Sequence, residues 1–261
     1  GDYTGTSDPF FTKKNNIISF VATKKEGWFI VIGEEEFGPF DYVDRFNTAL
    51  QVGTDDIAYT ASIGGKWSGN KYYGGKWFVV LNGKQGKTFD CIWITPQFDT
   101  LSGLMGYVGS NDGIWDSTGY QGGNYFVVVS DGEKEIISSP LPQIYSFKFS
   151  PYVKNSYALI IEIQREKPFQ LMFFDGKKAY FSDFYDGILD IKFHPSGKSI
   201  IATVVKKKKC ELISLSELGE RKILSSDYIT SVELDDKGKT IDALMLDKKK
   251  NLSYQINLPI D

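Results

Sequence analysis

The chain has very few of the residues on which most metal sites and nucleophilic active sites are built. It contains two cysteines and one histidine among 261 residues, too few for a zinc site that does not rely on carboxylates. Cys91 and Cys210 fall in non-adjacent repeats, so we expect two buried free thiols rather than a disulfide. No Ser-His-Asp or Cys-His set is recognisable around His194, which precedes a proline in a turn. The sequence predicts no metal and no cofactor.

The chain also lacks an excess of positive charge and any long apolar run. Its 30 lysines and arginines stand against 33 acidic residues, and the net charge of −3 provides no basic field to hold nucleic acid. No apolar stretch approaches the roughly 20 residues of a membrane-spanning helix. An apolar fraction of 41% nevertheless excludes a disordered chain. We expect a folded monomer with no transmembrane segment and no nucleic-acid partner.

Aromatic residues, in contrast, are abundant and recur in a repeated phrase. The chain has 19 Phe, 15 Tyr and 5 Trp, and four aromatic and β-branched runs each end at a glycine turn. The copies start at Trp28, Trp77, Tyr125 and Phe169, which gives a period of 44 to 49 residues. Each copy is typical of a strand that enters a hairpin. A period of this size made of strands indicates a radial array of small sheets, a β-propeller.

A second repeated element joins two strands through a turn that carries proline, aspartate or glycine. It reads Phe-Ser-Pro-Tyr at residues 149–152, Phe-His-Pro-Ser-Gly-Lys at 193–198 and Leu-Asp-Asp-Lys-Gly-Lys at 234–239. It resembles the Phe-Ser-Pro-Asp-Gly-Lys repeat of TolB-type, WD-like bacterial propellers, although His194 replaces the serine and Tyr152 and Val153 replace Asp-Gly. The resemblance implies a bacterial propeller outside the cytoplasm, periplasmic or extracellular. Because the chain begins without methionine, we expect that a signal peptide or lipid anchor was removed ahead of Gly1.

Together the two elements predict an all-β fold, a single β-propeller domain over residues 1–261 with blades of mostly four antiparallel strands. We expect six blades, with five or seven as alternatives, over residues 3–40, 41–90, 91–138, 139–182, 183–226 and 227–261. The last unit is short and lacks a fourth strand. Because an open edge exposes unpaired backbone groups, we expect the segment around Tyr3 to pair into the last blade, or the C-terminal strand to pair into the first. Closure by blade packing alone is a further alternative.

Two loops between the second and third strands of their units are longer than the others. They cover residues 63–75 and 109–123, are rich in glycine and carry tryptophan and tyrosine. Because they belong to neighbouring blades, we expect them side by side on one face, as a binding surface. The alternative is that the aromatic rings fold back and cover blade edges. The candidate ligand-binding residues are Trp67, Asn70, Tyr72, Tyr73, Asn111, Asp112, Trp115, Asp116 and Tyr120.

Aspartates recur near the places where one unit passes into the next. Propeller glycosidases need two carboxylates about 5–9 Å apart across a cleft, and these aspartates are the candidates for such a pair. The alternative is that each accepts local backbone hydrogen bonds in a connecting turn. The recurrence favours the structural interpretation, because a catalytic group should break the repeat. The residues concerned are Asp41, Asp90, Asp183, Asp186 and Asp227.

The sequence therefore favours a non-enzymatic binding or scaffold protein that displays aromatic-rich loops to a protein or carbohydrate ligand. One alternative is a carbohydrate-active enzyme that uses the recurring aspartates. Another is a purely structural repeat module within an assembly. Under the leading hypothesis no residue is assigned a catalytic role.

Overall fold

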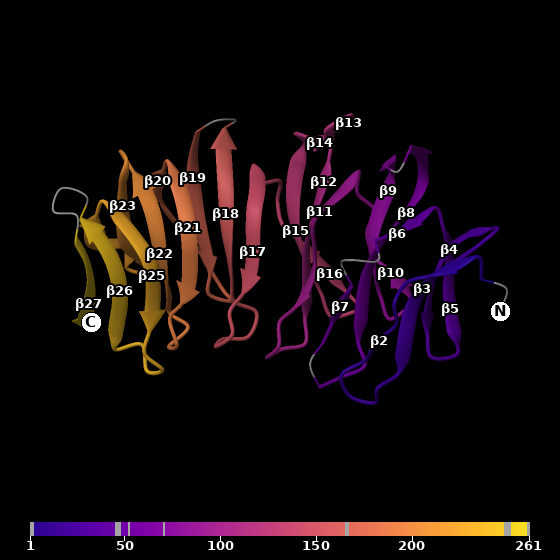
Figure 1. The fold of residues 1–261 in the computed structure, drawn as a ribbon, viewed down its shortest axis with the longest axis horizontal. Helices are drawn as coiled ribbons and strands as arrows, with labels where there is room; N and C mark the ends of the chain where they lie inside the picture. Colours follow the sequence, from indigo (N-terminus) through magenta and orange to yellow (C-terminus); the bar gives the residue numbers. More distant parts are fainter. Residues whose placement is uncertain are drawn as a thin grey trace. The chain divides into compact units, whose positions relative to one another are not determined.

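The computed structural model describes residues 3–44, 48–51, 53–69, 71–164, 167–247 and 252–259. These residues form antiparallel strands joined by turns and loops, and no helix occurs among them. The all-β prediction is therefore confirmed. The described part of the chain accordingly contains no helix that could cross a membrane. The chain divides into two compact units, Gly1–Gln143 and Ile144–Asp261 (Figure 1).

The first unit contains three main sheets. The first, in the order β1-β3-β4-β5 with β2 also on β3, is built from β1 (Gly5–Thr6), β2 (Phe10–Phe11), β3 (Ile18–Lys24), β4 (Gly27–Ile32) and β5 (Glu35–Phe40). The second, in the order β10-β9-β8-β6 with β7 on β8, is built from β6 (Tyr42–Val43), β7 (Ala49–Leu50), β8 (Ile57–Ser68), β9 (Lys71–Leu81) and β10 (Lys84–Gln85). The third is built from β11 (Cys91–Phe98), β12 (Met105–Asn111), β15 (Asn124–Ser130) and β16 (Glu135–Ile137), and a separate hairpin from β13 (Ile114–Asp116) and β14 (Gly119–Gln121).

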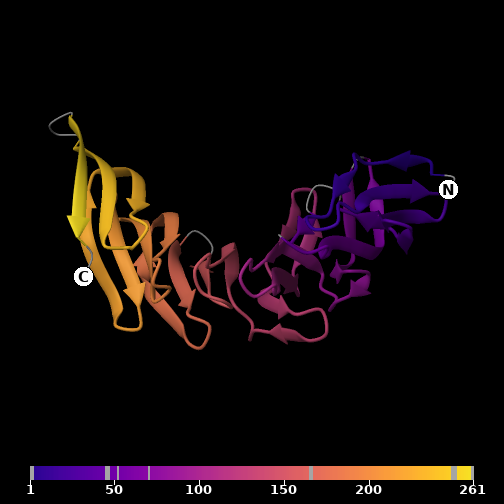
Figure 2. The ribbon, with the colours of Figure 1, turned by 90° about the horizontal axis from the view of Figure 1, so that it is seen from below.

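The second unit also contains three sheets, and each follows the chain strand by strand. Its first sheet is built from β17 (Gln143–Phe149), β18 (Tyr157–Gln164), β19 (Lys167–Phe174) and β20 (Ala179–Tyr185). The next is built from β21 (Gly187–Phe193), β22 (Ser199–Lys206), β23 (Lys209–Ser216) and β24 (Gly219–Ser226). The last has three described strands, β25 (Tyr228–Leu234), β26 (Thr240–Asp247) and β27 (Leu252–Pro259). Figure 2 shows these sheets stacked one behind another within the unit.

Each sheet is a meander of antiparallel strands, and within each unit neighbouring sheets pack face to face, which is the blade arrangement of a β-propeller-type fold. The second sheet shows why the aromatic phrase forms such strands. Tyr59 and Phe78 pack toward the first sheet, whereas Ala58 and Val79, their neighbours in the chain, pack toward the third. Because successive side chains point to opposite faces, a strand buried on both faces is apolar at every position. The count of six blades and the single-domain organisation stay predictions.

The N-terminal segment does not pair as the sequence analysis expects. Instead of joining the last blade, β1 pairs with β3 of the first sheet, with Gly5 opposite Thr23. The physical reason is that β2 pairs only with the start of β3, where Phe10 lies opposite Ser19, and the end of β3 is left for β1. The two short strands β1 and β2 together satisfy the edge of β3 that would otherwise be open. At the other end of the chain, β27 pairs with β26 of its own sheet.

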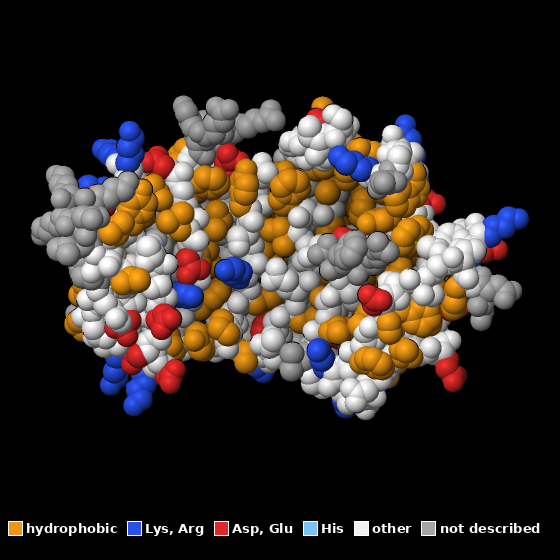
Figure 3. Space-filling model, viewed as in Figure 1, with side chains coloured by type: hydrophobic (Ala, Val, Ile, Leu, Met, Phe, Trp, Pro, Cys, Tyr) orange, Lys and Arg blue, Asp and Glu red, His pale blue; other side chains and the backbone are white. Residues whose placement is uncertain are grey.

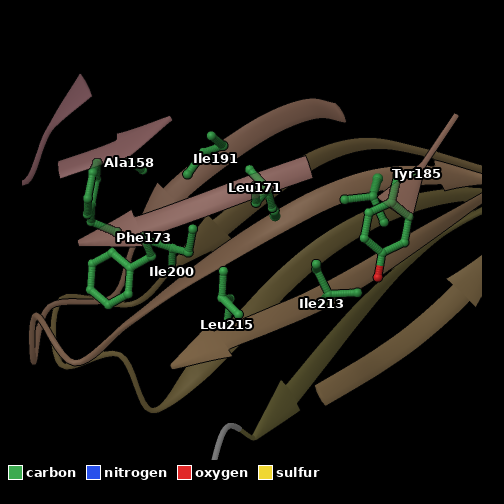
Figure 4. Close-up of a cluster of buried hydrophobic side chains, with 11 residues drawn as sticks. Ala158, Leu171, Phe173, Tyr185, Ile191, Ile200, Ile213 and Leu215 are labelled. Atoms are coloured by element: carbon green, nitrogen blue, oxygen red, sulfur yellow. The ribbon is translucent and has the colours of Figure 1, made fainter. Parts of the chain in front are cut away.

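The two cysteines are free and buried, as predicted. Burial raises the pKa of the Cys91 thiol to about 12, which keeps it protonated and unreactive at neutral pH. Between the first two sheets of the second unit lies a core that includes Leu171 and Phe173 of β19 and Ile200 of β22 (Figure 4). The Phe173 ring lies 6.5 Å from that of Phe193, at the end of β21. These apolar contacts join neighbouring sheets that share no backbone hydrogen bonds in the described pairing.

The Phe173→Ala substitution should destabilise the second unit by about 3–5 kcal/mol, because it leaves a cavity between two sheets. Phe181→Ala is the matched control, since this ring lies in the adjacent strand β20 and is 50% exposed. The control should change the free energy of unfolding by less than about 0.5 kcal/mol. Urea unfolding followed by circular dichroism measures both. Equal losses in the two variants would contradict the placement of the core.

Candidate functional site

The two long loops fold as equivalent hairpins. Strands β8 and β9 continue past their sheet into hairpin 1 (residues 62–69 and 71–75), in which Trp67 lies opposite Tyr72. Strands β13 and β14 form the tip of hairpin 2 (residues 110–123), in which Trp115 lies opposite Tyr120. Six residues of hairpin 1 recur as the same residue type 48 positions further along the chain, in hairpin 2: Ser62, Gly65, Trp67, Tyr72, Gly74 and Gly75. The second loop is therefore a second copy of the first.

Each hairpin is fixed at its base by a tyrosine hydroxyl. The Tyr72 hydroxyl accepts a hydrogen bond from the backbone N–H of Gly65 at 2.9 Å, and the Tyr120 hydroxyl accepts one from Gly113 at 2.8 Å. A Cβ atom at Gly65 or Gly113 would lie 2.3 or 2.4 Å from the facing tyrosine, so only glycine permits this approach. Burial raises the pKa of Tyr120, which keeps its hydroxyl protonated.

The tryptophan of each hairpin stacks on a tryptophan of the preceding sheet. Trp67 stacks on Trp28 of β4 with ring centroids 6.3 Å apart, and Trp115 stacks on Trp77 of β9 at 6.1 Å. The indole N–H of Trp115 also donates to the backbone carbonyl of Asp90 at 3.1 Å. The rings thus fold back over the sheets, as the alternative interpretation expects, but Trp67 keeps 48% of its surface exposed. Stacking orients the ring faces and leaves part of them open.

Further ring contacts join the two hairpins to each other. Tyr42 stacks on Tyr72 with centroids 5.2 Å apart and meets Trp77 edge-on at 5.6 Å. Tyr73 of hairpin 1 meets Trp115 of hairpin 2 edge-on at 6.4 Å. The two hairpins therefore lie side by side within the first unit. Tyr42 takes part in these ring contacts, but the sequence analysis does not identify it, because its sequence context indicates only a strand residue that follows a turn.

A pocket of about 390 Å³ opens between the two hairpins. Among the described lining residues six are aromatic, the others are polar, charged or glycine, and none is aliphatic. Of the predicted residues, Trp67, Tyr72, Tyr73 and Trp115 line the pocket, while Tyr120 is buried beneath hairpin 2. The full lining is Tyr42, Asp44, Trp67, Lys71, Tyr72, Tyr73, Trp77, Trp115, Thr118 and Gly119.

The predicted polar ligand contacts of hairpin 2 bond to partners within the protein. The Asp116 carboxylate accepts hydrogen bonds from the backbone N–H and the hydroxyl of Thr118 at 2.7 and 2.6 Å. The Asp112 carboxylate accepts one from the Asn124 side chain at 3.0 Å, and Asn111 accepts one from the backbone N–H of Asp90. None of these three lines the pocket. Asn70 lies outside the described residues.

The pocket's own polar groups are Asp44, Lys71 and Thr118. The sequence offers only a weak signal for them, because aspartate, lysine and threonine are common at the ends of strands and in turns. A stronger signal exists for Trp28 and Trp77, the rings on which the hairpin tryptophans stack. The repeated phrase begins with tryptophan only at Trp28 and Trp77, and each precedes a unit that carries a long hairpin. That coincidence could have identified the stacking pairs.

Three of the five recurring aspartates accept hydrogen bonds from backbone N–H groups. Asp41 accepts a hydrogen bond from the backbone N–H of Gly64 at 2.5 Å, Asp90 from Asp112 at 2.9 Å and Asp186 from Lys207 at 2.7 Å. The three donors lie in hairpin 1, in hairpin 2 and in the turn between β22 and β23, which are the equivalent connections of their sheets. Asp183 forms an ion pair with Lys206 at 3.4 Å, and Asp227 lies between β24 and β25. The shared geometry of Asp41, Asp90 and Asp186 supports the structural interpretation. Each carboxylate bonds to the connection between the second and third strands, however, and not to the connecting turn in which the aspartate itself lies.

Asp90 is the most engaged of these carboxylates. Burial alone would raise its pKa, but hydrogen bonds from Lys76 at 2.6 Å and from the Asp112 N–H outweigh burial and lower the pKa. The carboxylate is therefore ionised at neutral pH and holds the base of hairpin 2. Among the described residues, no group of three or more His, Cys, Asp or Glu side chains could bind a metal ion.

No family model and no curated protein sequence matches the chain. Solved structures that it is similar to include the β-propeller domain of Cps50 (Swd1) from Myceliophteria thermophila, at 8% identity and a TM-score of 0.40, over 99% of this chain and 90% of that one. TolB from Acinetobacter baumannii is 11% identical at a TM-score of 0.41, over 100% and 65% of the two chains. A hypothetical selenium-binding protein from Sulfolobus tokodaii is 12% identical at 0.44, over 95% and 70%. At these identities and scores the matches carry no inference about function.

Replacing Asp90 with asparagine should destabilise the first unit by about 1 kcal/mol at neutral pH, since it removes the charge that pairs with Lys76 and with the Asp112 N–H. Because the folded-state pKa is lowered, the wild-type advantage is fully present above the unfolded value of about 3.9 and disappears as pH falls through the folded value. Thermal unfolding from pH 7 to pH 2 follows this difference.

Asp8→Asn is the control, because Asp8 is exposed in the same unit. It should change the unfolding temperature little at any pH. If the difference in unfolding temperature between the wild type and Asp90→Asn stays constant down to pH 2, the Asp90 charge does not hold the hairpin.

Proposed function

We propose that the first unit is a non-enzymatic binding module that holds a saccharide in the pocket between the two hairpins. The observation that carries the proposal is the lining itself, six aromatic rings with Asp44, Lys71 and Thr118 among them. The C–H groups on one face of a sugar ring are slightly positive, and they pack well on the negative face of an aromatic ring. The charged and hydroxyl groups of the lining can bond the sugar hydroxyls.

The lining favours a saccharide over a peptide. Sites that capture protein side chains bury apolar anchors in well-packed pockets. Here the described lining has no aliphatic side chain, and it combines ring faces with the polar side chains of Asp44, Lys71 and Thr118. The most accessible ring, Trp67, lies on Trp28 on its inner side, and its 48% exposed surface is available for stacking. A protein ligand is the second candidate, and the test below distinguishes the two.

The site is formed before any ligand binds. Trp67, Tyr72 and Trp115 are each held by at least two other rings, and Tyr72 also by the Gly65 N–H. A ligand therefore meets rings that are already ordered, and the loss of side-chain freedom on binding is small. This rigid display by a stacked-sheet scaffold is the mechanism that we propose.

Binding without hydrolysis fits the distribution of carboxylates. A glycosidase places two carboxylates on opposite sides of the scissile bond, about 5–9.5 Å apart. Within the residues described around this pocket, one carboxylate lines it, that of Asp44. Asp41 and Asp90, the other candidates in this unit, each accept a backbone hydrogen bond at a hairpin base. A location outside the cytoplasm, as the TolB-type resemblance implies, belongs to the same proposal.

Trp67→Ala should lower the affinity for the bound oligosaccharide at least about tenfold, because it removes the exposed stacking face. Ile114→Ala is the matched control, since Ile114 is 72% exposed next to Trp115 but does not line the pocket. A glycan array and a peptide array probed with the wild type identify the ligand, and calorimetry with the best oligosaccharide compares the variants. Near-ultraviolet circular dichroism verifies that both variants are folded.

Retention of the oligosaccharide by Trp67→Ala, or equal loss in Ile114→Ala, would contradict the placement of the site. Binding on the peptide array alone, lost in Trp67→Ala, would contradict the saccharide and assign a protein ligand to the same pocket. No binding on either array would contradict a binding function for these hairpins.

A further inference from the structure

A second pocket lies in the second unit, at the turn end of its last two sheets. It encloses about 530 Å³ and is formed by the turns after β21, β23 and β25 together with the adjoining ends of β22, β23 and β24. Its lining is rich in hydroxyl and cationic side chains: His194, Ser196, Lys198, Ser199, Ser214, Ser216, Glu217, Leu218, Gly219, Arg221, Lys237, Gly238 and Lys239. Neither hairpin of the first unit takes part.

The alternation along β23 explains why the pocket is open. Leu212 lies in the apolar cluster between the two sheets, and Ser214 and Ser216 follow on the same face of the strand. Across the hairpin, Ile201 of β22 belongs to the same cluster, and Ser199 precedes it on that face. The packing face therefore changes from large apolar groups to serine toward the turns. Serine is too small to fill the space between two sheets, and a hydroxyl-lined gap remains.

Four cationic side chains surround this gap, Lys198, Arg221, Lys237 and Lys239, against one carboxylate, Glu217. In the part of the chain that the structure describes, none of the four forms an ion pair. Asp235 lies in the same turn as Lys237 and Lys239, and its carboxylate accepts a hydrogen bond from the backbone N–H of Thr240 at 2.8 Å. That bond, with further backbone N–H groups of the turn and the charge of Lys239, lowers the pKa of Asp235. In Figure 3, basic side chains project from this end of the unit, with acidic ones beside them.

The frame of the pocket is fixed by a hydrogen bond between the sheets. The His194 ring donates from Nε2 to the backbone carbonyl of Gly238 at 2.8 Å, because a carbonyl can only accept. Nδ1 is then the unprotonated nitrogen, and it accepts the backbone N–H of Ser196 at 3.1 Å. A Cβ at position 238 would lie 2.3 Å from Nε2, so glycine is needed there. Two turns that carry three of the four cations are thereby held together.

We propose that this pocket binds an oligophosphate, that is, a chain of linked phosphate groups. Arginine and lysine form charge-assisted hydrogen bonds with phosphate oxygens, and serine hydroxyls add neutral donors. A single phosphate would not span the space, whereas a chain of several can meet the cations of two turns and Arg221 of β24 at once. The site lies in a different unit from the aromatic pocket, so its test is independent of the saccharide test.

Calorimetry with inorganic tripolyphosphate tests the proposal on the full chain. The wild type should bind one equivalent, with an affinity that falls as sodium chloride is raised, because salt screens the cations. Arg221→Gln and the double variant Lys237→Gln/Lys239→Gln should each weaken binding at least about tenfold, equivalent to about 1.4 kcal/mol. These residues are exposed, so the variants are expected to fold.

Lys13→Gln/Lys14→Gln is the charge-matched control, because it removes two exposed cations from the first unit. It should bind tripolyphosphate as the wild type does. Three results would overturn the proposal. The first is that the wild type shows no saturable binding, the second is that the pocket variants bind as well as the wild type, and the third is that the control loses as much affinity as they do. Sodium sulfate at matched ionic strength should not compete; full competition would overturn the preference for a phosphate chain.

Discussion

The structure depends on the burial of both faces of its central strands. In the second sheet, Tyr59 and Phe78 pack toward one neighbour while Ala58 and Val79 pack toward the other. A sheet with two apolar faces is not stable alone in water, and stacking shelters one sheet against the next. This constraint fixes where each strand ends and therefore where its turns emerge. The hairpins, the aromatic pocket and the hydroxyl-lined pocket all lie at such strand ends.

Both pockets arise where the apolar pattern of the sheets gives way to other residues. In the first unit, β8 and β9 run past the sheet, and their continuation places Trp67 on Trp28. In the second unit, the serines of β23 follow Leu212 on one face and leave a gap that cations surround. In the first unit the strands extend beyond the core and carry aromatic rings there. In the second unit small serines replace large apolar side chains at the end of the core. Two different surfaces thus come from one repeated scaffold.

Much of the fold could be predicted from the sequence, because a strand that is buried on both faces appears in the sequence as a continuous apolar run. The phrase that starts at Trp77 is apolar at every position, and β9 lies there. The pairing of β1 could not be predicted, since Gly5 and Thr6 carry no strand pattern. In the site, the rings of Trp67 and Trp115 were predictable from composition. The polar contacts were not, because an aspartate such as Asp116 satisfies a backbone turn as readily as a ligand.

The central claim is that the hairpins are held in place before a ligand arrives. Hydrogen exchange of the Gly65 and Gly113 amides tests it directly, because each N–H donates to a tyrosine hydroxyl beneath the stacked rings. Both amides should exchange slowly, on the scale of amides within the sheets of the first unit. Exchange as fast as in an unstructured loop would mean that the rings do not hold the hairpins and that no formed pocket exists.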